Sequence, residues 1–473
     1  MQLMQKRMKG AVLRSALGLM TANLLAGAAN AQTPETVRIS PQPSTSTAEQ
    51  DFETGTDVNS GLTRIDSAVL FYQEAGGRVK AIEPVMSATL NGSDGQTLSA
   101  RFTYDSLTGA SPNGATPWRS AQTFTTPAHT PGTTSTTTSA SGRSVLVTIP
   151  GTGTVARQYT VPSGELPVDQ GFQDQRYAID LSYSRPLDET TRASIGGGYS
   201  HETDYQSYLA NVGLSKDFNQ HSTTVSASLN YEHDISSPAF GIPTPLRVMN
   251  ANIKGSDQTK DVINLVAGVT QVVNRYWLTQ LNYSVGQTTG YQSDPYRIVS
   301  VVDPTTGGPL RYLYESRPDS RLRQSIYFGN KIALGPTFVD LSARAYHDDW
   351  GINSATVELS DRVQFGPRFY VEPGVRYYKQ SAADFFHNYL LGGQAVPDFA
   401  SSDSRLDAFS AISANLKLGF KFTPTNEIYL QVQDYKQTGD TNTSGAPGYL
   451  ATQDLFSGSH ATSVMLGLSI AFR

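Results

Sequence analysis

The chain of 473 residues contains no cysteine and only three tryptophans. Without cysteine it can be neither a disulfide scaffold nor an acylated lipoprotein, and it cannot hold a c-type haem or a cysteine-based metal centre. Hydrophobic residues make up only 38% of the chain, and charged residues 16%. After residue 31 no apolar run approaches the roughly 20 residues of a membrane-spanning helix. A polar chain of this size, with 24 tyrosines and 41 glycines, fits either a secreted all-β protein or a membrane barrel.

The first 31 residues carry basic but no acidic side chains, at Lys6, Arg7, Lys9 and Arg14. A short stretch of apolar and small residues follows and ends at Ala29-Asn30-Ala31. This pattern predicts a signal peptide over residues 1–31, cleaved after Ala31. Cleavage would leave 36 − 4 = 32 basic against 41 acidic residues, a net charge of −9. An acidic exported chain lacks the basic footprint that nucleic-acid binding requires.

Residues 32–65 are rich in Ser, Thr, Pro and acidic residues and predict a flexible periplasmic leader. From residue 66 to residue 473 the pattern changes to short segments in which apolar and polar residues alternate. In the last segment, for example, Val464 and Leu466 alternate with Met465 and Gly467. A period of two residues indicates β-strands with one apolar and one polar face.

The alternation predicts sixteen strands, with fourteen or eighteen as the alternatives. They lie at residues 66–73, 78–90, 96–106, 174–184, 191–201, 205–216, 222–234, 261–273, 276–288, 322–334, 337–347, 352–365, 368–380, 409–423, 426–437 and 462–472. Every connection longer than six residues falls at an odd place in this series, and every even place is a tight turn. Bacterial outer-membrane barrels have short periplasmic turns and long extracellular loops, whereas a secreted sandwich has no reason to sort its loops this way. The sequence therefore predicts an all-β, antiparallel, up-and-down transmembrane β-barrel in the outer membrane of a Gram-negative bacterium.

Several stretches resemble one family of exported proteins, named domain of unknown function 3570. They include AVLFYQEAGGRVKAIEPV at 68–85, DSLTGASPNGATP at 105–117, YESRPDSRLR at 314–323, YHDDWGINS at 346–354, GVRYYKQSAADFF at 374–386 and SSDSRL at 401–406. The resemblance implies an outer-membrane barrel. It also implies an association with extracytosolic redox proteins, because the family's genes often lie beside flavin-transferase, thioredoxin-like and periplasmic lipoprotein genes. It implies no site residues.

The polar faces of the strands predict a set of charged side chains that point into a water-filled lumen, where they would form a constriction. These candidates are Arg323, Lys331, Asp340, Arg344, Glu358, Arg362, Glu372 and Arg376. Opposed rings of acid and base could select solutes, or the same residues could form structural ion pairs between neighbouring strands. Because arginine is frequent in this set, the sequence predicts a lumen that prefers anions.

Three other features suggest sites. The long connection at 107–173 could fold into the lumen as a plug or constriction, or lie on the surface as a mobile loop. Asp348 and Asp349, adjacent at a hairpin tip, could hold a hard cation, although a tight turn uses the same residues. The sequence Asp-Ser-Arg occurs twice, at 319–321 and 403–405, where a network of Arg and Asp between outer loops would explain it.

Enzymatic motifs are scarce, since none of the seven histidines has metal-ligand spacing or lies beside an obvious nucleophile. We therefore expect no enzyme, no cofactor and no firm metal site. The leading hypothesis is a porin-like channel or transport barrel for small polar solutes. The alternatives are an interaction barrel that binds a periplasmic lipoprotein or redox partner, and a membrane-embedded hydrolase in which His201 or His347 meets an acid.

Overall fold

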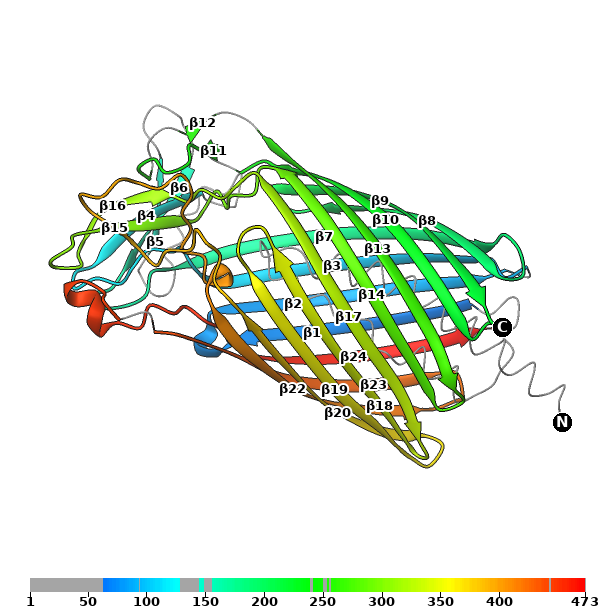
Figure 1. Cartoon of the computed structure of the whole chain (residues 1–473). Coiled ribbons are helices and arrows are strands. Elements are labelled where there is room, and N and C mark those ends of the chain that lie inside the picture. Colours follow the sequence, from blue (N-terminus) through cyan, green and yellow to red (C-terminus); the bar gives the residue numbers. More distant parts are fainter. Residues whose placement is uncertain are drawn as a thin grey trace.

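The computed structural model describes residues 63–92, 94–127, 144–148, 155–238, 241–249, 253–254, 257–441 and 444–472. Sixteen of its strands form one closed antiparallel barrel (Figure 1). They are β1 (Thr63–Glu74), β2 (Val79–Asn91), β3 (Thr97–Pro112), β7 (Val168–Pro186), β8 (Thr191–His201), β9 (Tyr205–Phe218), β10 (Thr223–Ser236), β13 (Gln258–Asn274), β14 (Trp277–Gly290), β17 (Ser320–Leu334), β18 (Thr337–Asp348), β19 (Asn353–Phe365), β20 (Phe369–Gln380), β22 (Phe409–Lys421), β23 (Glu427–Gly439) and β24 (His460–Phe472). The first and last strands close the barrel, with Thr63 opposite Phe472. The predicted strand count and antiparallel order are confirmed.

The connections are sorted between the two ends of the barrel as the sequence predicts. The long ones, at 113–167, 237–257, 291–319, 381–408 and 440–459, all lie at one end. The tight turns, such as 335–336 and 366–368, lie at the other end, together with the start of β1 and the end of β24. This arrangement places the long loops outside the cell and the short turns in the periplasm.

β1 begins at Thr63, so residues 63–65 of the predicted leader belong to the barrel, and two other strands extend much further than the sequence predicts. β3 continues to Pro112 rather than residue 106, and β7 begins at Val168 rather than residue 174. β3 and β7 stay paired beyond the ends of the other barrel strands, and the register of this pairing shifts between Gly109 and Ser111. Gly109 has φ +142°, and a Cβ there would lie 1.9 Å from the carbonyl oxygen of Arg78. The polarity pattern missed this extension because strand pairing above the membrane no longer needs an apolar outer face.

The barrel has its apolar side outside and its polar side inside. On β10, Val225, Leu229 and Tyr231 are 43–45% exposed, whereas the alternating Thr224 and Asn230 are 3% and 6% exposed. Apolar side chains point outward in the same way around the whole ring, for example Ile195, which is 59% exposed, and Phe369, which is 56% exposed. An outer surface of this kind is stable against lipid rather than water, and strands of 11 to 19 residues are long enough to cross a bilayer at a tilt. The chain is a transmembrane β-barrel.

Within the described part of the chain, no helix combines the length and the apolar character required to span a membrane.

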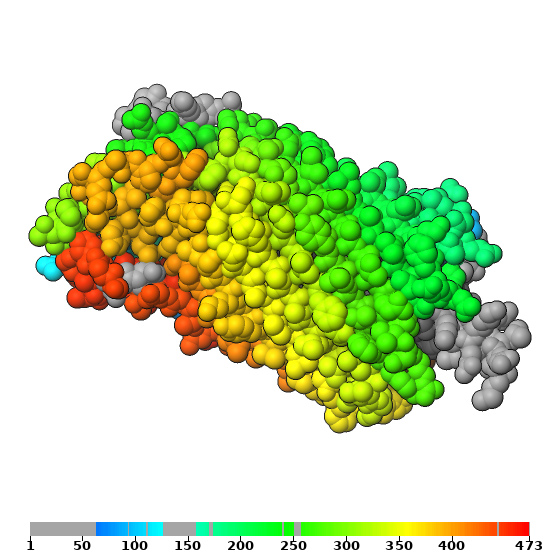
Figure 2. Space-filling view, in the orientation of Figure 1, coloured from blue at the N-terminus to red at the C-terminus, as the bar shows by residue number. Residues whose placement is uncertain are grey.

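The long loops pack together at their end of the barrel into a structure that we call the cap (residues 113–127, 144–148, 155–167, 241–249, 253–254, 291–319, 381–408 and 444–459). It contains three small sheets, formed by β4 (Gln122–Pro127), β6 (Val155–Val161) and β5 (Ser144–Thr148), by β16 (Pro309–Tyr314), β15 (Ile298–Val302) and β21 (Leu390–Leu391), and by β11 (Ile242–Pro243) and β12 (Ile253–Lys254). The cap segments coloured orange and red lie beside each other at one end of the molecule (Figure 2). Three short 3-10 helices, η1 (Ala75–Gly77), η2 (Ser404–Leu406) and η3 (Gly448–Thr452), also lie at this end.

An apolar core holds the cap together. Phe124 and Tyr159 pack with Ile298 and Tyr314, so the first long connection contacts the loop at 291–319. Of the predicted loop 107–173, the ends 107–112 and 168–173 belong to β3 and β7, and the described residues between 113 and 167 belong to the cap. A second core joins the hairpin tip at Trp350 to Phe385 and Leu406.

Tyrosine rings lie over glycines across four adjacent strands, β20, β22, β23 and β24, inside the barrel. Tyr370 lies opposite Gly419, which lies opposite Tyr429, which lies opposite Gly467. A Cβ added at Gly419 would lie 2.0 Å from the Tyr370 ring, and one added at Gly467 would lie 2.1 Å from the Tyr429 ring. The glycines therefore make room for the rings to lie flat on the inner wall.

We expect Gly419→Ala to lower the free energy of unfolding by about 1–3 kcal/mol, because the added methyl group forces the Tyr370 ring off its site. Urea titration of the protein in lipid vesicles, followed by tyrosine and tryptophan fluorescence, measures this loss. Gly92→Ala is the control, since the nearest atom to its Cβ is 3.5 Å away. Equal stability of the two variants would contradict the packing role of Gly419.

Candidate functional site

Charged side chains face the lumen on most barrel strands, and they are unevenly distributed. We call the inner face of β17 to β22 the basic wall. Its positive residues are Arg321, Arg323, Lys331, Arg344, Arg362, Arg376, Lys417 and Lys421, and its negative residues are Asp340, Asp348, Glu358 and Glu372. The formal charge of this wall is 8 − 4 = +4. Each of these positions alternates with outward-facing residues such as Ile326, Leu341, Val357 and Val375.

The opposite side of the lumen has the opposite sign. We call the inner face of β2 to β10 the acidic wall. Its negative residues are Glu83, Asp105, Asp174, Asp180, Asp217, Glu232 and Asp234, and its positive residues are Arg101, Arg176 and Arg192, so its formal charge is 3 − 7 = −4. In the ring of sixteen strands β17 lies eight places from β2, and β22 lies eight places from β9. The two walls therefore face each other across the lumen.

The structure brings the predicted constriction residues together on the basic wall, partly as ion pairs. Arg362 Nε lies 2.9 Å from Glu372 Oε2, and Lys331 Nζ binds the Asp340 carboxylate. Glu358 is the register partner of Arg376.

Aromatic rings line the same wall. The Arg344 guanidinium lies 5.7 Å from the centre of the Tyr327 ring, and that of Arg376 lies 5.7 Å from the centre of Tyr378. Lys417 Nζ lies 4.3 Å from the centre of the Tyr429 ring, which belongs to the adjoining strand β23. Cation–π contacts of this kind fix the positive groups against the wall.

The predicted anion preference needs revision on this geometry. The arginines that suggested it all lie on one wall, and the acidic wall opposite balances them, 4 − 4 = 0. The prediction rested on the arginines at residues 323–376, and the parity of the loop lengths does not show which charged strands face each other across the closed ring.

Asp348 and Asp349 are both used by protein donors. Asp348 Oδ2 lies 2.6 Å from Arg321 Nη2, and its Oδ1 accepts from the backbone N–H of Trp350 and Ile352 at 3.1 and 3.0 Å. Asp349 Oδ1 accepts from the N–H of Leu322 at 2.9 Å. Among the described residues no group of three or more His, Cys, Asp or Glu side chains could hold a metal ion. The pair therefore acts as a turn-forming and ion-pairing element in this structure.

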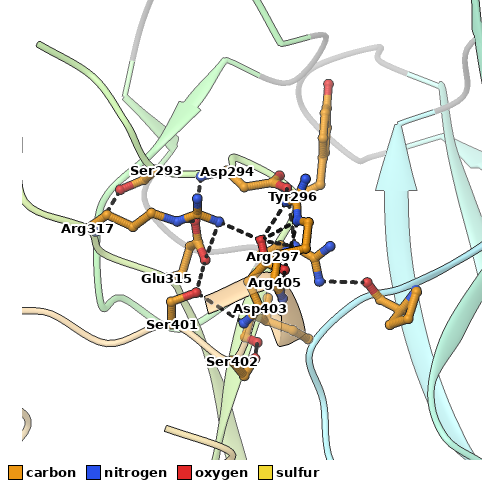
Figure 3. Close-up of polar contacts among 12 residues, drawn as sticks. Ser293, Asp294, Tyr296, Arg297, Glu315, Arg317, Ser401, Ser402, Asp403 and Arg405 are labelled. Carbon is orange, nitrogen blue, oxygen red and sulfur yellow. Dashed lines mark hydrogen bonds and ion pairs between the residues drawn. The ribbon is translucent and has the colours of Figure 1, made fainter. Parts of the chain in front are cut away.

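A second group of charges, buried or half-buried, lies in the cap (Figure 3). We call it the clasp; its members are Asp294, Arg297, Glu315, Arg317, Asp403 and Arg405. Asp403 Oδ2 is the shared acceptor, 2.9 Å from Arg317 Nη2 and 3.2 Å from Arg297 Nε, and it also binds Arg405. The side chains of Asp403, Arg317 and Glu315 are completely buried.

The clasp links three separate parts of the chain. Arg297 and Arg317 come from the connection 291–319, and Asp403 comes from the connection 381–408. Arg297 Nη1 also donates to the carbonyl oxygen of Pro112 at the end of β3, at 3.2 Å. The expected Arg–Asp network of the second Asp-Ser-Arg sequence is confirmed, since Asp403 and Arg405 both belong to it. No pattern in the sequence indicated that Arg297, Glu315 and Arg317 would join them.

Two buried acids of the clasp respond oppositely to pH. Burial alone would raise the pKa of Asp403, but Arg297, Arg405 and Arg317 outweigh it and lower the pKa far below its ordinary value. The contribution of Asp403 to stability is therefore present above the ordinary Asp pKa and is lost only as the pH falls through the lowered value. Burial raises the pKa of Glu315, against the attraction of Arg317, so its contribution is lost as the pH rises through the raised value.

The histidines proposed for a hydrolase do not meet an acid in the contacts that the structure shows. His347 Nδ1 lies 2.9 Å from the Asn353 amide oxygen, and His201 stacks on Tyr199 with ring centres 6.4 Å apart. His221 and His460 do contact carboxylates, of Asp217 at 2.8 Å and Asp434 at 3.0 Å.

Solved structures similar to this chain are other barrels. The siderophore receptor PirA from Pseudomonas aeruginosa matches with 10% identity and a TM-score of 0.36, over 80% of this chain and 56% of the receptor. A ferric enterobactin receptor mutant from the same organism matches with 13% identity and a TM-score of 0.40, over 81% and 54%. The CymD monoaromatic hydrocarbon channel matches with 9% identity and a TM-score of 0.35, over 88% and 89%. This chain thus spans little more than half the length of the two receptors, and likenesses with such TM-scores carry no functional inference.

No curated protein matches the chain significantly. A family model described as "Protein of unknown function (DUF3570)" matches residues 21–470, nearly the whole chain. With its closed barrel, polar lumen and loop-built cap, the chain belongs to the DUF3570 family.

Proposed function

We propose that this protein is a porin-like channel or transport barrel for small polar solutes in the outer membrane of a Gram-negative bacterium, exported by a signal peptide that is cleaved after Ala31. The observation that carries the proposal is a closed ring of sixteen strands with an apolar outer face and a polar inner face. Barrels of about 16–18 strands enclose an aqueous channel, whereas barrels of about eight strands are filled by side chains.

The inner wall supports passage of polar solutes rather than apolar ones. It carries charges of both signs on most strands, and hydroxyl and amide side chains such as Ser228, Asn264 and Asn415 lie between them. Groups of this kind can replace water around a polar solute, so they lower the barrier to its entry. The cap lies at one mouth of the barrel, where it would decide which solutes reach the lumen.

We expect the purified, refolded protein to produce stepwise conductance in planar lipid bilayers, with weak selectivity between cations and anions. Weak selectivity follows from the balance of the two walls, because each small ion meets a favourable and an unfavourable surface. Reversal potentials in a potassium chloride gradient measure it, and heat-denatured protein is the control. A folded but electrically silent barrel would refute the channel, and strong selectivity of either sign would refute the balance of the walls.

A further inference from the structure

The two walls of the lumen carry opposite charge and face each other, which creates an electric field directed across the channel rather than along it. Among the residues that contribute, Arg344 and Arg376 lie on the basic wall, and Asp180 and Glu232 on the acidic wall. All four are at least four residues from either end of their strands. The field therefore acts inside the barrel and not only at its mouths.

A transverse field distinguishes solutes by their charge separation. A small ion is attracted by one wall and repelled by the other, so the two interaction energies largely cancel. A neutral solute interacts weakly with both walls. A zwitterion has positive and negative groups a few ångströms apart, so it can turn its anionic end to the arginines and its cationic end to the carboxylates. Both ends are then stabilised at once.

The basic wall is built to present fixed positive groups. The contacts of Arg344 with Tyr327 and of Arg376 with Tyr378 place each guanidinium beside a tyrosine ring on its own wall. Arginine also offers planar donor pairs that match the geometry of a carboxylate. These features favour the carboxylate end of a zwitterion on this side of the lumen.

We propose that the lumen selects dipolar, zwitterionic solutes that bear a carboxylate and an ammonium group, which it orients between the basic and acidic walls. This inference rests on the proposed channel function and specifies its solute class. The field, rather than the net charge of the lumen, supplies the preference.

The test compares two isomers, the zwitterion β-alanine and the neutral lactamide, which share one molecular formula. Their rates of entry are measured by the swelling of proteoliposomes at pH 7, after subtraction of the rates in liposomes without protein. A field-collapsed variant combines Arg344→Gln, Arg376→Gln, Asp180→Asn and Glu232→Gln. It loses two positive and two negative charges, so its net charge is unchanged while both walls lose charge.

A matched variant also loses two charges of each sign but keeps the field. It combines Arg362→Gln with Glu372→Gln, and Arg64→Gln with Asp66→Asn, because each of these ion pairs lies on one strand or on adjacent strands. We expect the ratio of the β-alanine rate to the lactamide rate to fall about threefold in the field-collapsed variant and to stay near the wild-type ratio in the matched variant.

The possible results separate the two proposals. A wild-type protein that admits neither isomer overturns the channel and the solute class together. A wild-type protein that admits both, with a ratio that the field-collapsed variant does not lower, overturns the solute class and leaves the channel standing. An equal fall in the two variants also overturns it, because charge loss in general would then explain the change. Heat-modifiable migration on gels confirms that each variant has folded.

Discussion

Asp403→Asn is expected to open the cap while the barrel stays folded. Asp403 is completely buried and binds three arginines at once, so its loss leaves Arg297, Arg317 and Arg405 facing each other without their shared acceptor. Removal of one partner from a buried ion network generally costs about 3–5 kcal/mol. We expect this loss of stability to affect the cap alone, because the sixteen barrel strands are held together by their own backbone hydrogen bonds.

Limited proteolysis of the protein in vesicles measures the effect, through cleavage between residues 291 and 319 and between 381 and 408. Asp398→Asn is the control, since this exposed aspartate lies in the same connection. We expect rapid cleavage only in the Asp403 variant. A protease-resistant Asp403→Asn cap would show that the apolar core around Phe124 suffices without the clasp.

Leu229→Arg is expected to destabilise the barrel by about 2–4 kcal/mol, because it puts a charge on the face that contacts the middle of the bilayer. Leu229 lies near the middle of β10 and is 45% exposed. The neighbouring Ser228 points to the lumen, where Ser228→Arg would be hydrated. The same residue type is thus introduced one position apart on the two faces of one strand.

Urea titration in vesicles of matched lipid composition gives the two free energies of unfolding. We expect the loss from Leu229→Arg to exceed that from Ser228→Arg by at least about 2 kcal/mol. Equal losses would mean that both faces meet the same solvent, and a larger loss from Ser228→Arg would mean that the barrel is inverted.

The fold could be predicted from the sequence because two independent patterns agree. Alternation in segments such as 464–472 identifies strands, and the parity of connection lengths gives their order and the side of the membrane on which each loop lies. Both patterns arise from short-range constraints. Lipid requires an apolar outer face on each strand, and an up-and-down barrel places successive connections at opposite ends. The full lengths of β3 and β7 could not be predicted, because neither constraint acts on the outer parts of these strands.

The site could be predicted only in part. The direction of each charged side chain follows from the same alternation, so the members of the basic wall, such as Arg344 and Arg362, could be predicted to face the lumen. Which charges face each other depends on closure of the ring, and which loops meet depends on tertiary packing. The clasp joins Arg317 to Asp403 across 86 residues of chain, and no local pattern connects them.

The pairing of β1 with β24 also constrains how the protein is made. The first strand finds its second partner only among the last residues of the chain, from Ala461 to Phe472. Contacts between such distant segments form late, because the chain must bring its ends together before pairing stabilises them. Until that pairing forms, the edges of β1 and β24 remain open and are templates for aggregation, together with the apolar faces of the strands. Delivery of the whole polypeptide in an unfolded, escorted form is therefore a requirement of this architecture.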